Sequence, residues 1–111
     1  MILLDPERTF EVKYKDVKFT CKPIIASDMA KFMDMSAVFD DEGNAQVKVN
    51  ERNVKVCRKY IVSADGLEVK KGKKLPWRSE LVDRLPIDVI NYVANEIIRK
   101  SAPDEEDEKN S

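Results

Sequence analysis

Lysine residues are concentrated in one short stretch of the sequence, KKGKKLPWRS, at residues 70–79. Lysine and arginine side chains can bind phosphate groups, and the neighbouring Trp77, the only tryptophan, could stack on a base. The same letters are also typical of a solvated loop beside a tryptophan that covers the core. We favour the solvated loop because no aromatic residues are interleaved with the lysines. The basic patch of the alternative interpretation comprises Lys70, Lys71, Lys73, Lys74 and Arg78.

The usual catalytic residues are missing from the sequence. The chain has no histidine, which removes the common nucleophile–base pairs, and its three glycines are too few for a glycine-rich phosphate loop. The acidic run Asp40, Asp41 and Glu42 lacks the alternating oxygen ligands of a calcium loop. Two cysteines without histidine do not complete a structural zinc site. We therefore expect no enzymatic activity, no metal and no cofactor.

Charge is dense along the chain but nearly balanced. Charged residues make up 37% of the 111 residues, yet the net charge is −1. Because the segment DEEDEK at residues 104–109 carries −4, the rest of the chain carries +3. This balance gives no strong overall attraction to nucleic acid, so we do not expect nucleic acid to be the partner.

Length and composition predict one small domain at residues 1–102, followed by a disordered acidic tail at residues 103–111. No apolar run approaches the ~20 residues that a membrane-spanning helix needs, and the opening letters MILLDPER are too short for a signal peptide. Cys21 and Cys57 each lie in an apolar pattern, which favours two reduced, buried thiols over a disulfide. We expect a protein of the cytoplasm, without membrane contact.

The first part of the chain predicts a β-hairpin followed by a helix. Apolar and polar residues alternate over residues 9–24, and Lys15 with Asp16 forms the loop in the simplest register. Ser27 or Asp28 is expected to cap the helix, and Gly43 lies just past its end. In the hairpin, Phe10 faces Cys21, Val12 faces Phe19, and Tyr14 faces Val17. The apolar stripe of the helix is Met29, Phe32, Met33, Ser36 and Phe39.

The second part predicts further helices joined by turns. Residues 44–50 are expected to form a short strand or a connection, residues 51–62 a basic-faced amphipathic helix, and residues 67–69 a short strand. Ser79 is expected to cap a short helix, and Pro86 to open the last one. The stripe of that last helix is Val89, Ile90, Val93, Ala94 and Ile97. Together these elements predict an α+β fold, with an N-terminal antiparallel β-hairpin packed against three to four α-helices.

The order of motifs in residues 54–98 carries a family resemblance. A helix ending in KYIV is followed by the turn region DGLEVKKG, by LPW, by the short helix SELVDRLP, and by a helix rich in isoleucine and valine. This order resembles the small tail assembly chaperones of tailed bacteriophages and prophages. The sequence departs from their pattern in its basic approach to LPW and in a tryptophan placed after the loop. The residues that carry the last motif are Leu81, Leu85, Pro86, Val89, Val93 and Ile97.

The resemblance implies a binding protein of the bacterial host cytoplasm rather than an enzyme. Such chaperones coat the long tape measure protein, or another tail structural protein, until the tail tube polymerises around it, and they often self-associate. The rival interpretations are a nucleic-acid-binding or regulatory protein that uses the lysine loop, and a tail-completion protein that remains in the virion. We expect the client or self-association face to comprise Met29, Phe32, Met33, Phe39, Val89, Val93 and Ile97.

Overall fold

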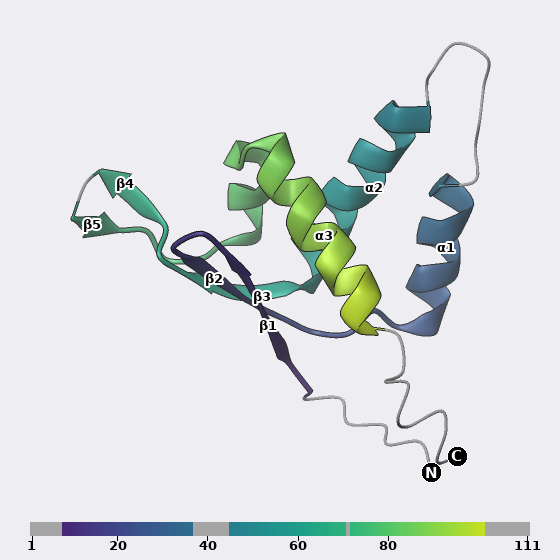
Figure 1. Cartoon of the computed structure of the whole chain (residues 1–111), viewed down its shortest axis with the longest axis horizontal. Helices are drawn as coiled ribbons and strands as arrows, with labels where there is room; N and C mark the ends of the chain where they lie inside the picture. The colour runs from purple at the N-terminus through teal and green to yellow at the C-terminus, as the bar shows by residue number, and fades with distance from the viewer. Residues whose placement is uncertain (1–7, 37–44, 71, 102–111) are drawn as a thin grey trace.

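The computed structural model describes residues 8–36, 45–70 and 72–101 (Figure 1). The predicted α+β class is confirmed, because a three-stranded antiparallel sheet of order β1-β2-β3 packs with several helices. Phe39, residues 40–43, Lys71 and the acidic tail lie outside the described residues. The elements are β1 (Phe10–Tyr14), β2 (Val17–Cys21), α1 (Ala26–Ser36), α2 (Ala45–Tyr60), β3 (Ile61–Asp65), β4 (Glu68–Lys70), β5 (Lys73–Lys74), the 3-10 helix η1 (Ser79–Arg84) and α3 (Ile87–Ser101).

The N-terminal hairpin has the predicted register. Val12 lies opposite Phe19, and the pairs at the two ends of the ladder also match. Lys15 adopts a φ of 52°, the left-handed conformation that a tight two-residue turn between twisted strands requires. The core face of the hairpin is therefore apolar, as alternation in the sequence dictates.

The end of α2 differs from the prediction. Ile61 and Val62 were expected to continue the helix, but they belong to β3, which pairs antiparallel with β2. β-Branched residues favour extended backbone, and β2 would otherwise have an unpaired edge. The backbone N–H of Lys22 donates to the carbonyl of Tyr60 at 3.0 Å, which joins the two segments where the helix ends.

Three predicted helix starts are also corrected. Residues 45–50 begin α2 and do not form a strand or a connection. α1 begins at Ala26, with the Met29 N–H donating to the Ile25 carbonyl at 2.9 Å, so neither Ser27 nor Asp28 is the cap. Arg78 holds the cap position of η1 in place of Ser79 and makes no side-chain cap hydrogen bond.

The core lies between the sheet and the helices. α3 packs against β1 and α2, while η1 covers one end of α2. Trp77 is half-buried with its ring edge-on to Phe19, 6.3 Å between centroids, so it covers the core as expected. The fully buried side chains include Val12, Phe19, Val56, Cys57, Val82, Val93, Ala94 and Ile97.

A polar seam runs through the contact between α2 and α3. Asn53 is 1% exposed; its Nδ2 donates to Asn91 Oδ1 at 2.8 Å, and its Oδ1 accepts from Arg52 Nε at 3.0 Å. Asn91 in turn donates to Asn50 Oδ1, and Arg52 reaches Asn95 Oδ1. A shift between the two helices would leave the buried Asn53 amide without its Asn91 partner, which costs about 1–3 kcal/mol. The seam therefore fixes their register.

Two glycines with positive φ provide a matched test of the packing around the hairpin. Gly66 has φ 105°, and a Cβ there would lie 2.5 Å from the Asp16 carbonyl oxygen. Gly72 has φ 87°, but a Cβ there would meet nothing within 4 Å. We expect Gly66→Ala to lower the free energy of unfolding by about 1–3 kcal/mol, and Gly72→Ala by clearly less. Equal losses in chemical denaturation would show that the approach to Asp16 has no energetic importance.

Candidate functional site

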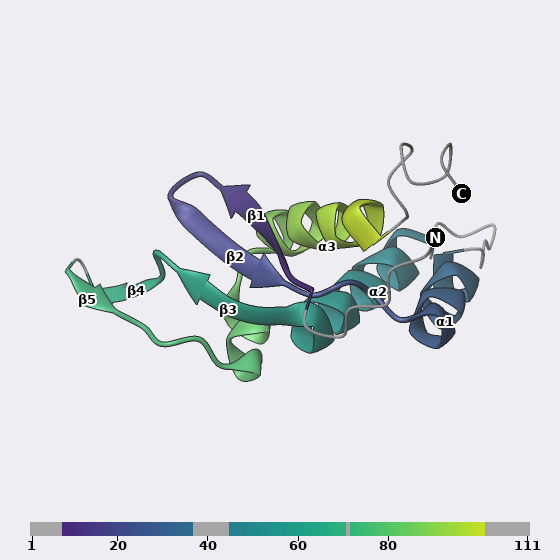
Figure 2. The same cartoon turned by 90° about the horizontal axis from the view of Figure 1, so that it is seen from below.

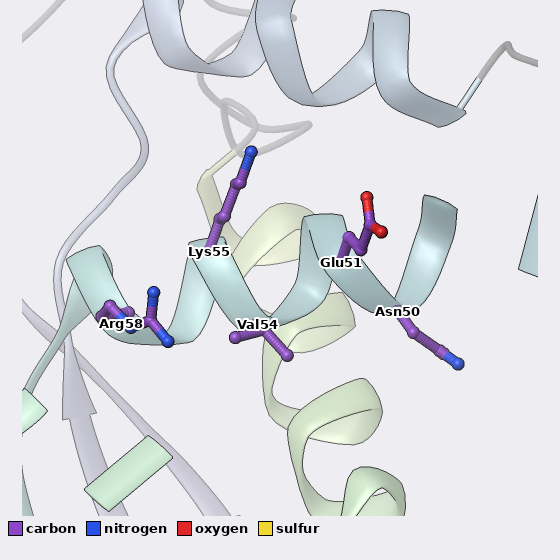
Figure 3. A pocket seen from close by; sticks show the side chains of 5 residues that line it. All are labelled: Asn50, Glu51, Val54, Lys55 and Arg58. Carbon is purple, nitrogen blue, oxygen red and sulfur yellow. The ribbon is translucent and has the colours of Figure 1, made fainter. Parts of the chain in front are cut away.

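The first hollow on the surface lies along α2 (Figure 3). It encloses about 360 Å³ and is lined by Asn50, Glu51, Val54, Lys55 and Arg58, all from that one helix. Figure 3 shows these side chains pointing in different directions rather than toward a common point. Arg58 forms an ion pair with Asp83, and Glu51 Oε2 lies 3.8 Å from Lys48 Nζ. The hollow therefore has no convergent groups that could orient a ligand.

A larger groove lies between α1 and the end of α3. It encloses about 600 Å³, and its described lining is mainly apolar. Met33 is 44% exposed here, and the neighbouring Met29 is half-buried. Methionine side chains are flexible and polarisable, so they adapt to differently shaped apolar partners. The lining residues are Ile24, Ala26, Met29, Met33, Ile98, Arg99 and Ser101; we call this set the α1–α3 groove.

α1 is held in place from its other side by the end of α2. The Asp28 carboxylate accepts a hydrogen bond from the Tyr60 hydroxyl and lies 2.5 Å from Lys59 Nζ. Phe32 packs edge-on against the Tyr60 ring, 6.4 Å between centroids. The Lys59 and Tyr60 hydrogen bonds hold the pKa of Asp28 below its ordinary value. These contacts leave Met29 and Met33 on the side that faces α3.

The opposite wall is tied to the segment that precedes α1. Ser101 Oγ accepts a hydrogen bond from the Ile24 backbone N–H at 2.9 Å and donates to the Ile97 carbonyl at 2.6 Å. Arg99 Nη2 forms an ion pair with Glu96 Oε2 on the same helix, at 2.6 Å. The groove therefore has two fixed walls, with the Arg99 guanidinium at its rim.

Only some residues of the predicted client face are exposed on the surface. Phe32, Val93 and Ile97 are 7%, 0% and 0% exposed, so they are core residues and cannot contact a partner in this conformation. The stripes of α1 and α3 serve first to cover the chain's own sheet, which is what a small domain needs. Val89 is half-buried against the core. Met29 and Met33 alone among the described members of that face line the groove.

Several groove residues were missed by the sequence analysis. Ile98 follows the buried stripe of α3 by one position, which places it at the edge of that stripe. Ile24 ends the alternating stretch of residues 9–24 and lies just after β2, so its pattern indicated the hairpin and not a groove. Ser101 was not identified because its role depends on a backbone 77 residues away. Only the position of Ile98 carried a signal in the sequence.

The predicted basic patch is divided in the structure. Lys70, Lys73 and Lys74 are exposed on the β4–β5 hairpin, while Arg78 precedes η1, where its Nε lies 3.7 Å from Glu80 Oε2. Of the basic residues of α2, Arg52 is buried at the α3 contact, while Arg58 and Lys59 form ion pairs with Asp83 and Asp28. The lysines are thus a separate feature of the hairpin.

The described residues offer little reactive chemistry. Burial raises the pKa of the Cys21 and Cys57 thiols to about 12, and both are free. Within residues 8–36, 45–70 and 72–101, no group of three or more potential metal ligands comes together. In the same ranges, none of the helices combines the length and apolar character required to cross a membrane.

Comparison with known protein-family models, curated proteins and solved structures finds no match to this chain. The case for a function therefore rests on the geometry of the α1–α3 groove and on the residues themselves.

The Asp28 contacts predict a specific dependence of stability on pH. The pKa of the Asp28 carboxyl is lower in the folded chain than in the unfolded chain, where it is about 3.9. The ionised carboxylate therefore stabilises the fold fully above about pH 3.9. This stabilisation is lost as the pH falls through the lower pKa of the folded state. Asp28→Asn is expected to reduce stability at pH 7, with a difference from wild type that narrows below about pH 4. Denaturation curves measured across this range test it. The exposed Asp34 provides the control, since Asp34→Asn should leave the curve unchanged.

The buried thiols predict slow chemical modification. A pKa moved from 9.0 to about 12 lowers the thiolate fraction at neutral pH about 1000-fold, and burial also blocks access. The native protein should react very slowly with a disulfide reagent, whereas both thiols should react at once in denaturant. Rapid modification of a folded sample would contradict the placement of Cys21 and Cys57.

Proposed function

We propose that this protein is a non-enzymatic tail assembly chaperone of a phage or prophage, which binds a helical segment of the tape measure or another tail structural protein in the α1–α3 groove. The observation that carries the proposal is the exposed methionine surface between two fixed walls, with Met33 44% exposed. The sequence resemblance supports the same role.

The groove suits an amphipathic helix of a client. Such helices place apolar residues at three- and four-residue spacing into hydrophobic grooves, and methionine-rich linings accept varied sequences. A long tape measure protein presents many such stripes before assembly. An adaptable groove would cover them in turn without demanding one sequence.

The chain is well suited to keep such a client in solution. Charged residues of both signs make up 37% of the chain, which favours solubility, and an acidic segment follows α3 in the sequence. The proposal places the protein in the host cytoplasm, where tail assembly takes place. Self-association on the client is part of this proposal.

Met33 provides the sharpest test of the groove. Met33→Asp should reduce client capture at least about tenfold, because the carboxylate must lose its water against an apolar helix. Ile87→Asp is the matched control, since Ile87 is also 44% exposed but lies at the start of α3, outside the groove lining. Phe32→Asp is unsuitable, because Phe32 is core and the chain would unfold. Circular dichroism should show both test variants folded.

The client is identified by capture from cells that express the neighbouring late genes, at moderate salt, followed by mass spectrometry. A long coiled-coil-rich protein that is retained by wild type and by Ile87→Asp, but lost with Met33→Asp, supports the proposal. Equal capture by both variants contradicts it. Finding the protein in finished virions would instead favour a tail-completion role.

A further inference from the structure

Lys70, Lys73 and Lys74 lie on a projecting ribbon rather than on a loop over the core. β4 and β5 pair antiparallel, Gly72 forms the turn with φ 87°, and the Leu75 N–H closes the base by donating to the Leu67 carbonyl at 2.8 Å. Figures 1 and 2 both show this ribbon extending away from the three helices. We call residues 68–70 and 72–74 the β4–β5 arm.

The arm holds like charges in an unfavourable arrangement. Lys70 lies directly opposite Lys73 across the ribbon, and like charges at such positions destabilise a strand pair. Glu68 lies opposite Lys74, and its Oε2 accepts from the Gly72 N–H at 3.3 Å. Within the described ranges, no carboxylate forms an ion pair with Lys70, Lys73 or Lys74. An external anion would therefore relieve this repulsion.

The chemistry of the arm favours phosphate over a protein partner. The centres of protein interfaces are depleted in lysine and rich in aromatic and apolar groups. Among the arm side chains that the structure describes, the exposed ones are instead three lysines and one glutamate. Lysines act as point charges, which is sufficient for contacts with a phosphate backbone, and a two-stranded ribbon fits the major groove of a duplex.

We propose that the β4–β5 arm binds the phosphate backbone of duplex DNA without base specificity. Trp77 takes no part, because its ring packs against Phe19 at the foot of the arm. The interaction is electrostatic and independent of the α1–α3 groove, so it goes beyond the chaperone role.

Binding of the full chain to a short labelled duplex, measured by fluorescence anisotropy against salt, tests the proposal. Three phosphate contacts predict a slope of log affinity against log salt of about −2.7, or a loss of about 40-fold between about 50 and 200 mM salt. The triple variant Lys70→Gln, Lys73→Gln, Lys74→Gln should bind at least about tenfold more weakly at the lower salt and lose most of this slope.

A control variant with the same charge change separates the arm from overall charge. Lys31→Gln, Lys48→Gln, Lys55→Gln removes three exposed helix lysines and should leave most of the affinity intact. Met33→Asp should bind the duplex like wild type, even though it loses the client. Equal loss in both triple variants overturns the proposal, as does the absence of duplex binding at the lower salt. Binding to polyglutamate in preference to the duplex would assign the arm to an acidic protein instead.

Discussion

Tyr60 ends α2, and the next residue already lies in β3, so helix and sheet meet without a connecting loop. Its side chain is 1% exposed, its hydroxyl contacts Asp28 of α1, and its backbone carbonyl accepts from Lys22 after β2. Burial and the Asp28 hydrogen bond raise the pKa of this phenol to about 12, which keeps it protonated as a donor. Tyr60 thus joins α1, α2 and the sheet at one point, and together with the Lys59–Asp28 ion pair it holds α1 beside the α1–α3 groove.

The fold class and the hairpin register could be predicted because they follow from short-range alternation. Val12 and Phe19 lie opposite each other because apolar residues alternate with polar ones along both strands, and this alternation sets the register. The end of α2 could not be predicted in this way. Val54, Cys57, Tyr60 and Ile61 have helical spacing, yet Ile61 is drawn into the sheet by the unpaired edge of β2. A local pattern does not contain information about a distant edge.

The candidate site, too, could be predicted from the sequence only in part. The methionines of α1 were found because their spacing is helical, but that spacing could not separate the exposed Met33 from the buried Phe32. The lysines were found from composition alone, whereas their projection on a ribbon depends on the pairing of β4 with β5. Figure 1 shows α1 and the β4–β5 arm at opposite ends of the molecule, so two partners could be held without steric conflict.

β1 is an outer strand of its sheet, and its backbone would be open to pairing with another chain. Lys100 from the end of α3 reaches this edge; its Nζ donates to the Glu11 carbonyl at 2.8 Å and lies 5.9 Å from the centre of the Phe10 ring. An incoming strand would have to displace this ammonium group and leave it without its acceptor. The last turn of α3 thus protects the β1 edge of the sheet against pairing with another chain.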